Sequence, residues 1–202
     1  MPETQDQHFN LTVHEWKTWD YFTSVVRHLV EHQITQYVDI GANVGGVAHV
    51  LLESVPSLQR CYLFEPQAAN YAFMKNKFGD NPKVDCLNWG IFYGQTQSQL
   101  YRTDRNVGGY TVVPEAGFTD QGETCNLTTL ESYEFSRIDF IKIDVEGAEY
   151  NIIENSSLLK TVKFLDIEFH KPTTTEYIHT HFPNHKIAVS MPNNGHVFLV
   201  KH

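Results

Sequence analysis

From residue 35 onward the chain alternates between short β-rich segments and amphipathic helical segments, and no other feature constrains the fold as strongly. Strands are predicted at residues 35–40, 61–66, 83–92, 138–144 and 163–169. Helices are predicted between them at residues 44–54, 67–79 and 148–159. Repeated strand–helix–strand units form a parallel sheet with helices on both faces. The sequence therefore predicts a doubly wound α/β fold.

The two ends of the chain depart from this alternation. Residues 14–33 carry apolar side chains at helical spacing, which predicts one amphipathic helix. Near the other end, Asn193-Asn194-Gly195 separates two β-rich stretches and predicts a hairpin, because an Asn-Gly pair accepts positive φ. We therefore expect a helical cap at residues 1–34, followed by a main domain at residues 35–202 that closes with an antiparallel edge.

Charge and composition exclude several classes of protein. The chain has 15 Lys and Arg against 24 Asp and Glu, whereas binding of bulk nucleic acid requires a cationic surface. No stretch approaches the roughly 20 apolar residues of a membrane helix, and the polar start lacks a secretory signal. The 3 cysteines are odd in number and form no CxxC pair, which favours free thiols. We expect a cytoplasmic protein with no membrane span, and its oligomeric state stays open.

The first predicted strand runs into a glycine-rich turn, Asp39-Ile40-Gly41-Ala42-Asn43-Val44-Gly45. Glycine lets the backbone turn sharply and approach a ligand, and the helix that follows offers free N–H groups. Asn43 stands where the dinucleotide motif GxGxxG has its second glycine, which disfavours NAD. Asp39, two residues before the first glycine, suits a ligand with a cationic amino acid portion.

The next two strand ends carry side chains that suit a nucleoside. Glu65-Pro66 follows the glycine turn by about 20 residues, where nucleotide-binding folds use an acid to accept hydrogen bonds from ribose hydroxyls. Asn88 is a candidate for hydrogen bonding to adenine or to the ligand backbone. Trp89 is a candidate for stacking on a base, although packing in the core is the commoner fate of tryptophan.

The fourth strand end concentrates acidic residues. Asp144, Glu146 and Glu149 lie within six residues, next to Gly147. Such carboxylates repel one another unless a cationic or hydrogen-bonding group lies between them. We expect Asp144 to face the cleft. Glu149 falls in the first turn of a helix, where the helix dipole favours an acid, so we expect it to be structural.

The fifth strand end adds a carboxylate and an imidazole. Strand alternation places Asp166, Glu168 and His170 on one face. A carboxylate and a histidine at a strand end suit a general base or, together with Asp144, a hard-metal site. Because the ligand spacing matches no recognised metal motif, we expect no metal.

These motifs together resemble the FkbM family of S-adenosylmethionine-dependent methyltransferases. The resemblance covers about residues 36–170 and rests on VDIGANVG (38–45), FEP (64–66), TTLESYEFSRIDFIKIDVEGAE (128–149) and LDIEFH (165–170). It implies a class I methyltransferase fold, a Rossmann-like seven-stranded sheet of order 3-2-1-4-5-7-6 with strand seven antiparallel. Residues 35–202 would then be the S-adenosylmethionine-binding methyltransferase domain.

The resemblance also implies roles for individual residues. Those implied to contact the cofactor are Asp39, Gly41, Ala42, Asn43 and Gly45 at the methionine part, Glu65 and Pro66 at the ribose, Asn88 and Trp89 near the adenine, and Asp144. Asp144 and Glu146 would lie beside the reactive methyl group and the acceptor. The candidates for the base that accepts the acceptor's proton are, in order, Asp144, Glu146, His170 and Glu168.

We therefore expect in-line methyl transfer to a hydroxyl of a sugar, a glycan or a small metabolite. Two alternatives stay open: an NAD-dependent oxidoreductase, which Asn43 disfavours, and a catalytically inactive domain that binds a nucleoside. The glycine-hinged segment 106–111 suits either a lid that carries Tyr110 over the acceptor or a plain hairpin turn. Trp16 and Trp19 suit either the pocket or the packing of the first helix.

Overall fold

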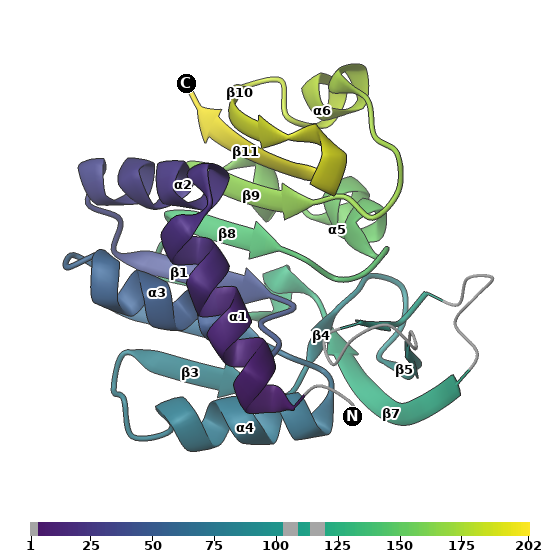
Figure 1. Cartoon of the computed structure of the whole chain (residues 1–202). Helices are drawn as coiled ribbons and strands as arrows, with labels where there is room; N and C mark the ends of the chain where they lie inside the picture. Colours follow the sequence, from purple (N-terminus) through teal and green to yellow (C-terminus); the bar gives the residue numbers. More distant parts are fainter. Residues whose placement is uncertain (1–3, 103–108, 114–119) are drawn as a thin grey trace.

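A seven-stranded sheet lies at the centre of the computed structural model, which describes residues 4–102, 109–113 and 120–202 (Figure 1). Its order is β10-β11-β9-β8-β1-β2-β3. The bounds are β1 Gln36–Ile40, β2 Arg60–Phe64, β3 Val84–Leu87, β8 Phe140–Ile143, β9 Phe164–Glu168, β10 His185–Met191 and β11 His196–Lys201. The adjacent strands β3, β2, β1, β8 and β9 are all parallel to one another, whereas β11 is antiparallel to both β9 and β10. The predicted fold class, strand order and antiparallel seventh strand are confirmed.

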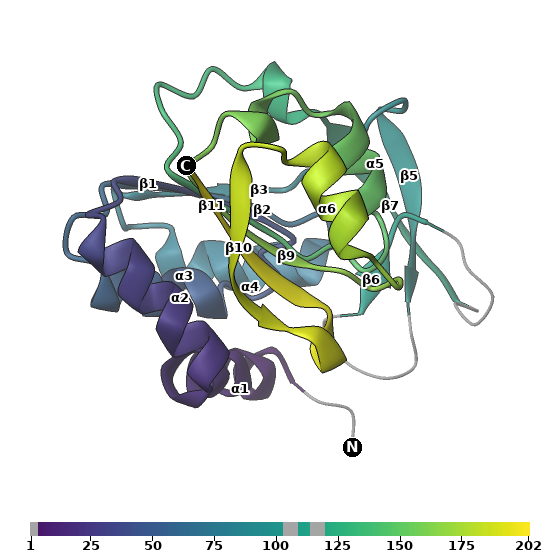
Figure 2. The ribbon, with the colours of Figure 1, turned by 90° about the horizontal axis from the view of Figure 1, so that it is seen from above.

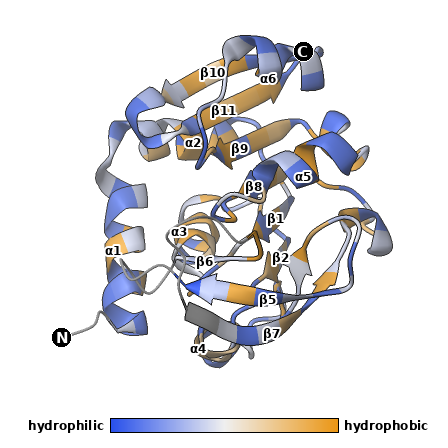
Figure 3. Cartoon of the chain, turned by 90° about the vertical axis from the view of Figure 1, so that its right-hand side faces the viewer, coloured by the Kyte–Doolittle hydropathy of each residue, from blue (hydrophilic) through white to orange (hydrophobic). Residues whose placement is uncertain are grey.

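Helices cover both faces of this sheet (Figure 2). One face carries α1 (Gln5–Thr18), α2 (Asp20–Glu31), α3 (Gly46–Ser54) and α4 (Ala68–Phe78), and the other carries α5 (Glu149–Asn155) and α6 (Thr175–His181). Alternate strand residues explain the two layers: Tyr37 and Phe140 pack with α1–α4, whereas Val38 and Ile141 pack with α5 and α6. Figure 3 shows apolar residues concentrated in the strands of the central sheet, while α1 is mostly hydrophilic. The helix predicted at 148–159 ends early, at Asn155, and α6 was not predicted.

The single helix predicted at residues 14–33 is wrong, because the structure has two helices that meet at Trp19. This residue has an extended backbone, with φ −78° and ψ 135°, and so it interrupts the helical hydrogen bonds. The first helix begins earlier than predicted, where Thr4 and Gln7 form a capping box. Aromatic side chains of both helices, among them Trp16 and Phe22, join the core that α3 and the sheet build.

A second, four-stranded sheet of order β4-β7-β5-β6 follows β3 in the chain. It consists of β4 (Gly90–Ile91), β5 (Gln97–Arg102), β6 (Tyr110–Thr111) and β7 (Asp120–Thr128). The strand predicted at 83–92 is therefore two strands in different sheets, with the break at Asn88 and Trp89. Of the segment predicted as a lid or turn, residues 106–108 lie outside the described residues, and Tyr110 and Thr111 form β6.

Two expectations from composition concern the described residues. None of their helices is both long enough and apolar enough to cross a membrane. The three cysteines, Cys61, Cys86 and Cys125, are free thiols, as predicted. Burial raises the pKa of Cys61 to about 12 and that of Cys125 to about 11, so both are unreactive at neutral pH.

Candidate functional site

A pocket of about 320 Å³ lies beside the carboxyl ends of β1, β2 and β8. Ligands of open α/β sheets bind at such strand ends. Three parts of the chain form its walls: the central sheet, the helices α1 and α2, and the small sheet. Among the lining residues are Gly41, Ala42, Asn43, Glu65, Pro66, Asp144, Glu146 and Glu168, all predicted site residues.

The glycine turn after β1 packs backbone against backbone on the turn after β8. Gly41 has φ +83°, and a Cβ at this position would lie 1.8 Å from the carbonyl oxygen of Asp144. Gly45 has φ +79° and precedes α3 as its N-cap. Both positions therefore require glycine, because each has a positive φ and leaves no room for a Cβ; at Gly45 the Cβ would lie 2.5 Å from a ring carbon of Phe78.

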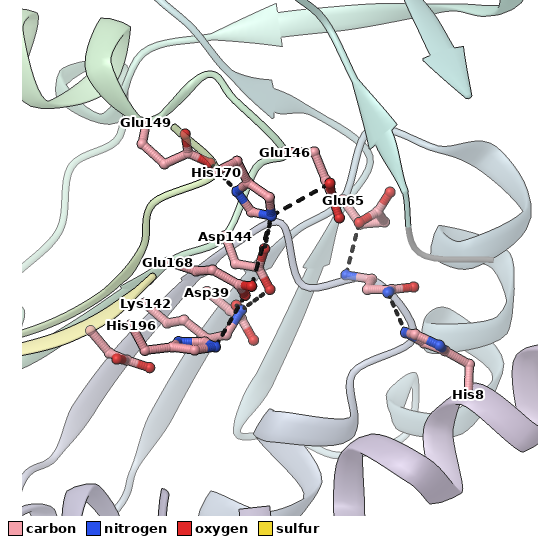
Figure 4. Close-up of polar contacts among 12 residues, drawn as sticks. His8, Asp39, Glu65, Lys142, Asp144, Glu146, Glu149, Glu168, His170 and His196 are labelled. Carbon is pink, nitrogen blue, oxygen red and sulfur yellow. Dashed lines mark hydrogen bonds and ion pairs between the residues drawn. The ribbon is translucent and has the colours of Figure 1, made fainter. Parts of the chain in front are cut away.

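Glu65 joins the glycine turn to the end of β2. Its two carboxylate oxygens accept hydrogen bonds from the backbone N–H groups of Asn43 and Gln67, each at 2.8 Å. The Asn43 side chain lies 2.8 Å from Nε2 of His8, which connects the turn to α1 (Figure 4). Burial raises the pKa of Glu65 to about 7. Glu65, the acid predicted to bind the ribose, thus lies at the pocket, where its hydrogen bonds also stabilise the glycine turn.

A row of buried charges crosses the floor of the site. Strand register places Asp39 of β1, Lys142 of β8 and Asp166 of β9 side by side. Lys142 Nζ donates a hydrogen bond to Asp144 at 2.9 Å and lies 3.9 Å from Asp39. Neither carboxylate oxygen of Asp39 has a hydrogen-bond partner within the described part of the chain, and burial raises its pKa to about 6. The other buried acid, Asp166, accepts a hydrogen bond from Tyr21 of α2.

His170 lies among the predicted acids at the ends of β8 and β9 (Figure 4). Its Nδ1 is 2.8 Å from Oε1 of Glu149. Its Nε2 is 3.4 Å from a carboxylate oxygen of Glu146, 3.8 Å from one of Glu168 and 3.9 Å from one of Asp144. The structure therefore brings together all four residues that the sequence suggests as the base.

The electrostatics of this cluster differ from residue to residue. Burial opposes ionisation of Asp144, but the charges of Lys142 and His170 outweigh it and lower the pKa to about 2. Burial and the Asp144 charge raise the pKa of Glu146 to about 7 and that of Glu168 to about 9. Burial disfavours the charged form of His170, but its hydrogen bond to Glu149 and the nearby acids raise its pKa to about 10. Near neutral pH, Glu146 is thus the acid best matched to proton transfer.

Asp144, Glu146 and His170 also meet the composition of a metal site. One ligand atom from each lies within 4.8 Å of those of the other two. Two carboxylates and an imidazole suit a divalent cation. The same atoms form the hydrogen-bonded and ion-paired cluster just described, so the expectation that no metal is used stays a prediction.

Some predicted residues lie apart from the pocket walls, and some pocket residues were not predicted. The side-chain amide of Asn88 donates to the backbone carbonyls of Glu65 and Pro66, at 2.9 and 3.1 Å, and Trp89 is 38% exposed. Their contacts with adenine stay predictions.

Lys142 and His196 line the pocket without having been predicted. For Lys142, the sequence signal is its place two residues before Asp144, on the same face of the strand. His196 stands opposite Glu168 in the β9–β11 register, and its Nε2 lies 3.3 Å from that acid. The aromatic residues left open at the start of the chain line the pocket as well: Trp16 stacks on Phe22, and Trp19 is half exposed.

Comparison with known proteins gives one family match. The model of the Methyltransferase FkbM domain family matches residues 39–197, most of the chain. No curated protein matches the chain.

Solved structures share its fold at low sequence identity. The methyltransferase FkbM from Methylobacillus flagellatus KT superposes with a TM-score of 0.58 and 18% identity, covering 84% of this chain and 44% of that one. An rRNA methylase from Streptococcus thermophilus superposes with a TM-score of 0.54 and 13% identity, and the match covers 91% of this chain and 98% of that one. A protein of the NADB-Rossmann superfamily from Streptococcus agalactiae has a TM-score of 0.51 and 13% identity, and the match covers 88% of this chain and 67% of that one. The chain thus spans less than half the length of the Methylobacillus protein, and these likenesses are of fold alone.

Proposed function

Because the chain belongs to the FkbM methyltransferase family, we propose that it transfers a methyl group from S-adenosylmethionine to a hydroxyl of a sugar, a glycan or a small metabolite. The observation that carries this proposal is the pocket at the strand ends, with the glycine turn on one side and the acidic cluster on the other. A sulfonium with an amino group is a cationic ligand, and this pocket has more acidic than basic groups on its walls.

The residues at the glycine turn fit this cofactor. Gly41 and Gly45 add no side chain to the turn, Asn43 and Ala42 line the pocket, and Glu65 has carboxylate lone pairs left for ribose hydroxyls. The buried carboxylate of Asp39, which accepts no hydrogen bond from the described residues, suits a cationic amino acid portion. When bound, S-adenosylmethionine supplies an electrophilic methyl group. The α1 and α2 helices, within the cap we propose at residues 1–34, cover the side of the pocket where an acceptor would enter.

In this proposal Glu146 accepts the proton of the acceptor hydroxyl. It lines the pocket, and its pKa of about 7 lets it take a proton near neutral pH. Asp144 stays ionised because Lys142 holds it, and it serves as a fixed negative charge beside the reacting groups. Trp16 and Phe22 keep water from the apolar side of the pocket.

The cofactor is tested by calorimetric titration of the protein with S-adenosylhomocysteine and, on the same preparation, with NADH. Micromolar binding of the first compound and no binding of the second is the expected result. Binding of NADH alone would favour the oxidoreductase alternative. Absence of S-adenosylhomocysteine binding to the folded protein would overturn the proposal.

The base is tested with two variants in a methyl-transfer assay over a panel of sugar and metabolite acceptors. Glu146→Gln should lower kcat by at least about 100-fold, the usual contribution of general-base catalysis. Asp144→Asn should also abolish turnover, and both variants should bind S-adenosylhomocysteine within a few-fold of the wild type. Loss of cofactor binding in Asp144→Asn would instead make Asp144 a cofactor ligand or a structural residue. Cofactor binding with no turnover on any acceptor would support the inactive nucleoside-binding domain.

A further inference from the structure

The C-terminal end of α2 brings three side chains that can bind a metal ion to one face of the helix. They are His28, Glu31 and His32, at positions i, i+3 and i+4, and one ligand atom from each lies within 4.8 Å of those of the other two. Two histidines four residues apart on one helical face are the pair by which H-E-x-x-H helices bind zinc. Glu31 and His32 are exposed, so a cation can reach them from solvent.

A hydrogen bond decides which nitrogen of His32 is available to a metal. Its Nδ1 lies 2.9 Å from the backbone carbonyl oxygen of His28. Because a carbonyl only accepts hydrogen bonds, Nδ1 carries a proton, and in the neutral ring Nε2 has the lone pair. Histidines that bind metals almost always donate their other ring N–H in this way. The His32 ring is therefore held in the tautomer that binds a metal through Nε2.

Packing against the central sheet holds both histidine rings. The ring centroid of His28 lies 5.6 Å from that of Phe198 in β11, and the centroid of His32 lies 5.0 Å from that of Phe164 in β9. Nδ1 of His28 has no hydrogen-bond partner among the residues that the structure describes. Rings that packing has oriented lose little freedom when they bind a ligand, so the pair is preorganised for a metal ion.

The charges at this end of α2 also favour a cation. The C-terminus of a helix has a partial negative charge, which attracts cations and disfavours acids. Glu31 is the last residue of α2, and within the described part of the chain its side chain forms no hydrogen bond or ion pair. A metal ion bound here would neutralise both the carboxylate and the end of the helix.

The three residues lie far from the pocket of the proposed function. The chain passes from α2 into β1, so this end of the helix lies at the amino ends of the parallel strands, whereas the pocket lies beside their carboxyl ends (Figure 1). None of the three residues lines that pocket. The expectation of no metal, which concerned the strand ends, is therefore a separate matter.

We propose that His28, Glu31 and His32 bind one zinc ion per chain, with water as the fourth ligand. Two imidazoles and a carboxylate are ligands that zinc accepts, whereas calcium and magnesium prefer oxygen ligands alone. This inference goes beyond the proposed function and gives zinc no part in methyl transfer. Zinc joins residues one turn apart and stabilises the end of α2. The next residue, Gln33, has φ +49°, a left-handed backbone that is unfavourable for a residue other than glycine.

The first test is calorimetric titration of the untagged protein with zinc chloride, where we expect one ion per chain and micromolar affinity. His28→Gln and His32→Gln should each weaken binding at least about tenfold, because loss of a group that merely supports a metal ligand costs about 10–100-fold. Glu31→Gln removes the charged oxygen ligand and should weaken binding as well. The matched control is His179→Gln, an exposed histidine in the last turn of α6 with no histidine four residues away, which should leave the affinity unchanged.

Two further measurements locate the ion and its effect. In NMR spectra of the histidine rings, zinc should shift the signals of His28 and His32, each assigned by its loss in the corresponding variant, and leave that of His179 in place. In thermal unfolding, the Tm of the wild type should rise with zinc concentration, because the ion binds the folded chain, whereas the Tm of His32→Gln should not.

The inference is overturned if the wild type binds no zinc at submillimolar concentration, or if His32→Gln and Glu31→Gln bind it as the wild type does. Loss of binding in His170→Gln but not in His32→Gln would place the ion in the acidic cluster at the strand ends instead. Half an ion per chain, with dimers in sedimentation, would replace this site by one that two copies share. If His28→Gln does not fold, the variants at the two exposed positions still give the answer.

Discussion

Replacing Gly41 with alanine is expected to cost more stability than the same replacement at Gly94. Both glycines have positive φ, +83° and +101°. An alanine at either position therefore lowers the free energy of unfolding by about 1–2 kcal/mol, because it must adopt a left-handed backbone. At Gly94 a new Cβ meets no atom within 4 Å, whereas at Gly41 it lies 1.8 Å from the carbonyl oxygen of Asp144. Gly94→Ala therefore measures the backbone cost alone.

The additional cost at Gly41 follows from the packing of the two turns. To reach ordinary van der Waals contact, the turns after β1 and β8 must move apart by about 1.6 Å or more. That movement strains the hydrogen bonds from Asp144 N to Ile40 O and from Gly41 N to Phe64 O, both 3.0 Å. At about 1 kcal/mol for each bond, Gly41→Ala should be about 2 kcal/mol less stable than Gly94→Ala.

Urea unfolding followed by circular dichroism measures this difference, and in thermal unfolding it corresponds to roughly 4–8 °C in Tm. Gly41→Ala should also lose affinity for S-adenosylhomocysteine, because the turn moves, whereas Gly94→Ala should keep it. Equal midpoints for the two variants would refute the reasoning, since the close backbone approach would then carry no energetic weight.

Two further predictions concern the buried acids and the aromatic wall. Burial raises the pKa of Asp166 from 3.8 to about 7, so the folded state binds a proton that the unfolded chain releases. Its contribution to the free energy of unfolding should fall as pH rises from about 4 to about 7. Asp166→Asn should therefore weaken the dependence of the free energy of unfolding on pH, which urea unfolding at several pH values measures. The same pH dependence in Asp166→Asn and in the wild type would disprove the prediction. Trp19→Ala should raise the acceptor KM about tenfold, equivalent to about 1.4 kcal/mol, with cofactor affinity unchanged. A change in cofactor affinity alone would place Trp19 at the other end of the pocket.

The sequence by itself predicts the main sheet and the places where function is to be sought. Period-two strands and period-3.6 helices are local patterns, and their alternation leaves few ways to build the sheet. The glycine turn at Gly41 and the acids Glu65 and Asp144 stand at the ends of predicted strands, so their convergence follows from parallel pairing. The motif resemblance adds the strand order, which the structure has.

Other features depend on contacts between distant segments, and only the tertiary structure decides them. The apolar stripe of residues 14–33 continues through Trp19, but packing over the glycine turn and along the sheet divides it into two helices. The small sheet was missed because its strands are mostly polar, and its own core cluster is small, with Leu100, Cys125 and Leu127 as the buried members among the described residues.

The pairing of charges is the clearest case. Lys142 neutralises Asp144 and lies beside Asp39 because β8 pairs with β1 in one particular register, and a shift of one residue would turn Lys142 to the other face of the sheet. His170 contacts Glu149 only because the first turn of α5 lies beside the end of β9 in the folded chain. Local patterns identify the acids and the histidine, but burial and register determine which of them hold protons. An acid's pKa depends on the charges and solvent around it, and folding alone brings those together.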